Sequence, residues 1–121
     1  MNFKKVKGEG PERIKVDMLD PILAPGSAHT ATAPITVSPS GLSCRGELYL
    51  GSAKAATSGL KTFTSTGAAQ TISFPITMPT AAGLSYPVYL DIYADSVLIA
   101  AYVATEDVVI PSAVVGPIVW A

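Results

Sequence analysis

Short runs of alternating apolar and polar residues, separated by turn-forming residues, dominate this chain. Seven runs have this pattern: residues 30–37, 42–50, 61–65, 70–78, 88–93, 97–104 and 108–110. The residues between them are rich in Gly, Pro, Ser and Asp, which favour turns. No window of about a dozen residues has a helical apolar stripe free of Gly and Pro. The pattern therefore predicts an all-β domain of about seven strands.

The clearest hairpin is predicted late in the chain. In the run 88–93, apolar Val88, Leu90 and Ile92 alternate with the more polar Tyr89, Asp91 and Tyr93, which is the two-residue period of a strand. The Asp95-Ser96 turn follows, and the run 97–104 is almost continuously apolar. These two runs should form a hairpin, with 97–104 as a central strand.

Two earlier runs carry positional signals. In 42–50 the alternation directs Leu42, Cys44, Leu48 and Leu50 inward, and Gly46 marks a bulge or a close backbone approach. We expect the run 30–37 to pair with 42–50. Pro75 has no N–H group, so it restricts the run 70–78 to a sheet edge or a broken strand.

The remaining residues form two arms around a core domain of residues 27–110. In the N-terminal arm, residues 1–26, Ile14, Val16 and Met18 alternate ahead of Pro21, so this arm is predicted to add a strand to its own sheet or to a neighbour's. The C-terminal arm, residues 111–121, has no charge and contains Val114, Val115, Ile118, Val119 and Trp120. We expect it to be buried against a partner. The alternative is that both arms fold back on their own domain.

The segments ATAPITVSPSGLSCRGELYLG and QTISFPITMPTAAGLSYPVYLDIYADSVLIAAYVA resemble immunoglobulin-like and fibronectin-type accessory modules, of the bacterial adhesion type or the phage virion-associated type. The resemblance covers roughly residues 27–110 and rests on the Ser-Pro-Ser-Gly turn, the Met78-Pro79 strand end and a strand marked by Gly83, Tyr86, Val88 and Leu90. It implies an immunoglobulin-like antiparallel β-sandwich. The antibody hallmark of two cysteines around a tryptophan is missing.

Charge limits the classes of partner. Charged residues make up 14% of the chain, against roughly 25% in an average protein. Ser, Thr and Ala lose little on burial, so we interpret the surface as one that a partner covers; an extracellular or crowded setting is the alternative. The chain has a net charge of −1, which does not indicate the strongly basic patch that nucleic-acid binding requires. No apolar stretch is long enough to span a membrane.

Catalytic and metal-binding residues are not predicted. His29 and Cys44 are the only residues of their types and stand far apart, which gives neither a catalytic triad nor a zinc site. Glu106 and Asp107 are adjacent and point to opposite faces of a strand; a weak calcium site with Asp91 and Asp95 is the remaining alternative. We therefore expect no enzyme activity and no cofactor.

Tyrosines offer a candidate binding face. Tyr49, Tyr89 and Tyr93 are predicted to share one outward face, which would stack on a sugar or a protein. Cross-strand aromatic pairs that support the sheet are an equal alternative.

From these observations we expect a non-enzymatic structural protein of a symmetric assembly, specifically a capsid decoration or cement protein of a tailed bacteriophage. It would be assembled in the host cytoplasm, because Lys4 and Lys5 are not followed by the apolar stretch of a signal peptide. Its partners would be copies of itself, capsid proteins or other virion proteins. The predicted interface residues are Ile14, Val16, Met18, Tyr49, Tyr89, Tyr93, Val115, Ile118, Val119 and Trp120. The alternative is an adhesion or carbohydrate-binding module of a bacterial surface, which uses the tyrosine face.

Overall fold

Every one of the seven predicted runs contains a strand in the computed structural model, which describes residues 11–19 and 21–121. Ten strands and no helix form in that part of the chain: β1 (Arg13–Val16), β2 (Ala28–Thr36), β3 (Ser43–Leu50), β4 (Ala56–Thr57), β5 (Lys61–Thr64), β6 (Ala69–Thr77), β7 (Leu84–Tyr86), β8 (Val88–Ala94), β9 (Val97–Ala104) and β10 (Val108–Ile110). The all-β prediction is confirmed. The additional strands β1, β4 and β7 are short, with two to four residues each.

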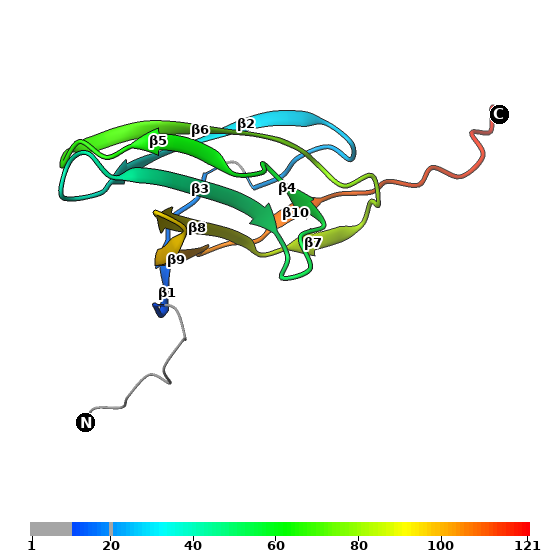
Figure 1. Cartoon of the computed structure of the whole chain (residues 1–121). Helices are drawn as coiled ribbons and strands as arrows, with labels where there is room; N and C mark the ends of the chain where they lie inside the picture. The colour runs from blue at the N-terminus through cyan, green and yellow to red at the C-terminus, as the bar shows by residue number, and fades with distance from the viewer. Residues whose placement is uncertain (1–10, 20) are drawn as a thin grey trace, which may run out of the picture.

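The strands form two layers (Figure 1). The large layer is a six-stranded sheet in the order β1-β9-β8-β3-β4, with β5 also paired to β3. The small layer contains only β2 and β6, which pair with each other along their whole length. A third pair, β7 with β10, lies at one end. The small layer therefore covers only part of the large one.

The predicted hairpin of β8 and β9 is confirmed. The strands pair antiparallel, and Asp95 and Ser96 form the two-residue turn with φ of 48° and 71°. Positive φ at both central residues is the conformation that matches the twist of a two-residue hairpin. β9 lies between β1 and β8, as expected of a central strand.

One predicted strand pairing and the purely antiparallel topology are wrong. β2 pairs with β6 and not with β3, because its inward residue Ile35, together with Val37 directly after the strand, packs against Cys44 of β3 across the core. Strands in one sheet cannot cover each other's apolar face, so β2 has to lie in the opposite layer. β1 pairs parallel to β9, which makes the large sheet mixed where an antiparallel sandwich was predicted.

The core lies between the layers in two clusters that share Leu48. One contains Ile35, Val37, Cys44, Phe74 and Ile92, and the other contains Leu50, Ala56, Ile76, Met78, Val88, Val108 and Ile110. Phe74 is fully buried, and a side chain at Gly46 would come within 3.2 Å of its ring. This confirms the predicted close approach at Gly46. Pro75 lies in β6, whose only ladder partner in the described chain is β2, so the edge prediction also holds.

Candidate interaction surfaces

A polar and aromatic network covers the outer face of the large sheet, opposite the core. Arg13 of β1 donates to Asp91 of β8 over 2.7 Å and to the carbonyl oxygen of Tyr102 over 2.8 Å. The Tyr49 hydroxyl donates to the other Asp91 oxygen over 2.8 Å. Asp91 is only 7% exposed, and a buried carboxylate needs hydrogen-bond partners in place of water. The Arg13 cation and the Tyr49 hydroxyl are these partners. The network ties β1, β8 and β3 together.

The neighbouring carboxylate on this face has its own cation. Glu47 lies directly opposite Asp91 in the β3–β8 ladder, and two like charges at such positions repel each other. Lys54 forms an ion pair with Glu47 at 2.8 Å, and Thr57 donates to the second Glu47 oxygen. The Lys54 ammonium group also lies 4.8 Å from the centroid of the Tyr49 ring. The hydrogen bond from Lys54 to Glu47 raises the pKa of Lys54.

The three predicted tyrosines do share this outer face, but two of their rings are engaged by their own chain. Tyr49 is buried, and its ring centroid is 5.4 Å from that of Tyr89. The Arg13 guanidinium carbon lies 4.7 Å from the Tyr89 centroid. Tyr49 and Tyr89 are cross-strand partners, so these contacts favour the alternative in which the two tyrosines stabilise the sheet. Tyr93 is half-buried opposite Arg45.

Alkaline pH should test the burial of Tyr49. Desolvation, then the hydrogen bond to Asp91, raises the pKa of Tyr49 from 10.0 to about 12. Between pH 10 and 12 the folded protein therefore keeps the Tyr49 hydroxyl proton that the unfolded chain releases. The stabilisation from this hydroxyl is complete below pH 10 and is lost as pH rises toward 12. Urea unfolding between pH 10 and 12 should show that the free energy of unfolding falls more steeply with pH in the wild type than in Tyr49→Phe. Equal slopes for the two proteins would contradict the assignment.

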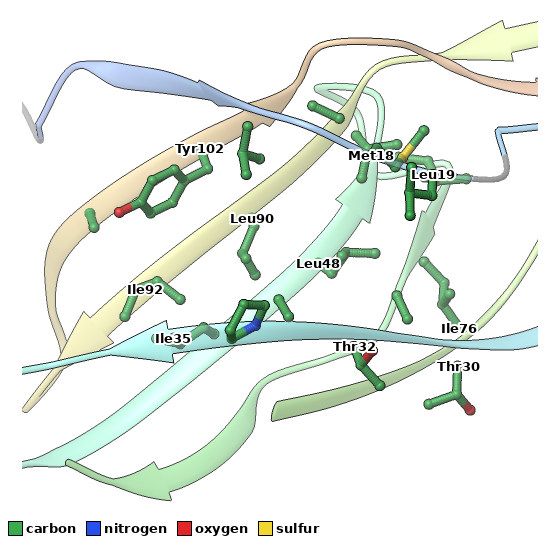
Figure 2. A pocket seen from close by; sticks show the side chains of 18 of the residues that line it. Met18, Leu19, Thr30, Thr32, Ile35, Leu48, Ile76, Leu90, Ile92 and Tyr102 are labelled. Atoms are coloured by element: carbon green, nitrogen blue, oxygen red, sulfur yellow. The ribbon is translucent and has the colours of Figure 1, made fainter. Parts of the chain in front are cut away.

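A groove of about 720 Å³ opens between the two layers beside β2. Its floor comes from β8 and β9, including Leu90, Ile92 and Tyr102, and its wall from the inward residues of β2. Figure 2 shows Leu90 and Ile92 reaching from β8 toward β2, with Met18 and Leu19 at one end of the groove. The groove exists because no described strand continues the small layer beyond β2, above β9 and β1.

The edge of β2 along this groove has free hydrogen-bonding groups. The amide of Met78 donates to the carbonyl of Ser27, so odd-numbered residues of β2 direct their backbone groups toward β6. Pro34 and Pro75 fall in pairs of the other parity, opposite Thr71 and Thr30, where no donor toward the partner strand is needed. The N–H groups of Thr30, Thr32 and Thr36 therefore point to the outer edge, where the described chain supplies no strand. This edge was not predicted from the sequence, because the run 30–37 was expected to pair with the run 42–50.

The apolar residues of the N-terminal arm lie beside the same groove. β1 joins its own sheet, and Val16 and Met18 line the groove, while Ile14 faces the same side and is exposed. Residues 1–10 and 20 of this predicted arm lie outside the described residues.

The C-terminal arm leaves the domain after β10 and extends away from both layers (Figure 1). Its apolar side chains are between 76% and 95% exposed: Val114, Val115, Ile118, Val119 and Trp120. The alternative in which this arm folds back on its own domain does not occur in the structure. The arm begins from a fixed point, because the Gly83 amide donates to the Ile110 carbonyl over 2.6 Å.

The candidate chemical residues lie apart. The His29 ring is within hydrogen-bond distance of the Ser27 hydroxyl at 2.7 Å, and Cys44 is fully buried in the core. Glu106 and Asp107 are exposed in the loop before β10. Among residues 11–19 and 21–121, no three His, Cys, Asp or Glu side chains gather as metal ligands would.

Comparisons with models of known protein families, with curated proteins and with solved structures find no match to this chain. In the described part of the chain, no helix has the length and apolar composition needed to cross a membrane.

Proposed function

We propose that the chain is a non-enzymatic structural subunit of a symmetric assembly, of the immunoglobulin-like sandwich type, and that residues 111–121 join it to other copies of itself. The observation that supports this proposal is the exposure of five large apolar side chains on one uncharged segment. Burial of a single valine or isoleucine side chain contributes roughly 1.5–3 kcal/mol. Such a segment is costly in water and suited to an interface.

The low charge of the remaining surface supports the same function. Interfaces are depleted in charged residues at their centres, and the chain has few. Two of the cations near the tyrosine face, Arg13 and Lys54, pair with Asp91 and Glu47 and lie against the Tyr89 and Tyr49 rings. These internal contacts give no specific support to a carbohydrate site. The narrower assignment to a virion decoration protein, with capsid or other virion proteins as partners, stays a prediction of the sequence.

Light scattering of the full-length protein tests the proposal. The wild type should have a mass that is a multiple of 12.5 kDa, and it should dissociate on dilution. The double variant Ile118→Asp with Val119→Asp places a charge on both faces of the segment and should return the mass to that of one chain. Both residues are exposed, so the thermal unfolding of the monomer should stay cooperative.

A matched control uses an exposed leucine elsewhere. Leu60 is 50% exposed and lies outside the groove and the arm, so Leu60→Asp should leave the mass of the assembly unchanged. A wild type that stays monomeric, or a double variant that assembles like the wild type, would refute the proposal.

A further inference from the structure

We propose that residues 111–121 of one copy bind as an additional strand along the outer edge of β2 in a second copy and fill the groove between its layers. This inference rests on the function proposed above, and it adds the docking site and the binding mode. The occupant is a segment of this chain, because the segment and the groove are both apolar and both lack a partner within the described residues.

The length and the composition of the two partners agree. β2 spans nine residues, and the segment 111–121 is long enough to pair along it and has no charged residue. The groove is lined mainly by apolar residues, among them Ala33, Leu90 and Ala100. A strand added here would extend the small layer over β9 and β1, and would cover the exposed side chains of Ile14 and Val16.

The prolines of the segment determine which residues can pair with β2. Pro111 and Pro117 have no N–H and are both odd-numbered, so odd-numbered residues must direct their backbone groups away from β2. The even-numbered residues Val114, Gly116, Ile118 and Trp120 then meet the free groups of Thr30, Thr32 and Thr36. An edge that has donors and acceptors at alternate residues is the template for strand addition.

The direction of the added strand then determines its buried face. In a parallel pair, a residue whose backbone groups point toward the partner strand lies opposite one whose groups point away. Even-numbered residues of the segment would thus lie beside the odd-numbered, inward residues of β2, such as Ala31 and Ala33. Parallel addition directs Val114, Ile118 and Trp120 into the groove, whereas antiparallel addition directs Val115 and Val119 inward. We assign the parallel direction because it buries the larger side chains.

A second copy accounts for the geometry better than the same copy does. The exit of the segment is held at Ile110 by Gly83, and the segment then runs outward from the end of the domain (Figure 1). Binding in the same chain would require the segment to reverse its direction directly after this point. Binding to another copy needs no such reversal.

The β2 edge is tested with two proline variants of the full chain. Thr32→Pro removes an N–H at the free edge and leaves the ladder to β6 intact, because Pro34 already occupies a position of the same parity. Ser73→Pro is the matched control: Ser73 lies opposite Thr32 and directs its N–H to the far side of β6. We expect association to weaken roughly tenfold in Thr32→Pro and to be unchanged in Ser73→Pro. Equal association in both variants would overturn the docking site.

Ala33→Phe gives a second test that does not depend on how β2 tolerates proline. Ala33 faces the groove, so a phenylalanine ring should occupy it and block the segment without loss of monomer stability. Association like that of the wild type would overturn the docking site even if Thr32→Pro failed to fold. If these variants assemble while the arm variant Ile118→Asp with Val119→Asp does not, the proposed function stands and only the site is wrong.

Single charges and the fluorescence of the only tryptophan test the direction and the partner. Ile118→Asp should abolish association and Val119→Asp should preserve it; the reverse result would overturn the parallel direction. The emission of Trp120, which is 90% exposed in the single chain, should shift to the blue as the wild type associates. A blue-shifted monomer would place the segment in its own groove. An associated wild type that still binds an apolar dye in the groove, with Trp120 exposed, would show that the segment does not fill the groove. Either result would overturn the proposal.

Discussion

Replacing Phe74 with alanine is expected to lower the free energy of unfolding by about 3–5 kcal/mol. The side chain of Phe74 is fully buried between the two layers, and its ring lies against the backbone of Gly46. Gly46 is held on both sides, by Lys61 of β5 and by Ile92 of β8. Because this backbone cannot move into the space left by the ring, the cavity should persist and the loss should fall in the upper part of that range.

Urea unfolding followed by far-ultraviolet circular dichroism measures this loss. Thr71→Ala on the same strand is the control, because Thr71 is exposed and a surface substitution changes stability by about 0.5 kcal/mol or less. A loss below about 1 kcal/mol in Phe74→Ala would mean that the small layer contributes little to the fold.

Replacing Asp91 with alanine is the second large effect, with an expected loss of about 2–3 kcal/mol. The change removes the acceptor of both Arg13 and Tyr49 and leaves the buried Tyr49 hydroxyl without its partner. The loss should be smaller than for a fully buried ion pair, because the Arg13 side chain keeps 32% exposure and can turn to water. Asp107→Ala, at an exposed residue, should cost much less.

A double-mutant cycle separates the contributions at Asp91. If the hydrogen bond between Tyr49 and Asp91 accounts for part of the loss, Tyr49→Phe should cost less in the Asp91→Ala background than in the wild type. Additive effects of the two substitutions would show that they do not act on one contact. Amide hydrogen exchange in β1 should also accelerate in Asp91→Ala, because Arg13 ties β1 to the sheet.

The shape of the proposed assembly depends on how the segments are exchanged. Two copies that exchange their segments reciprocally form a closed dimer, whereas a head-to-tail series forms a ring or a filament. Reciprocal exchange requires the exit of each segment to lie near the groove of the other copy. The mass of the wild type by light scattering therefore distinguishes the closed dimer from the larger forms.

The sequence predicted the parts of the candidate surfaces that depend on local patterns. The apolar and uncharged character of segment 111–121 was evident from its composition, and the shared face of Tyr49, Tyr89 and Tyr93 followed from the alternation in 42–50 and 88–93. The network around Asp91 was missed, because Arg13 reaches it from a strand 78 positions earlier in the chain. No periodicity in the sequence indicates such a contact.

The sequence by itself determined the seven main strands, their inward faces, the β8–β9 hairpin and the close approach at Gly46, because side-chain alternation, turn chemistry and the absence of a side chain are local properties. Only the tertiary structure decided that β2 pairs with β6, that β1 joins β9 in parallel, and that the small layer has two strands. Alternation states which face of a strand is apolar and does not state which strand lies beside it. The packing of one layer on the other determines that β2 pairs with β6. The free edge of β2 and the groove beside it follow from that pairing.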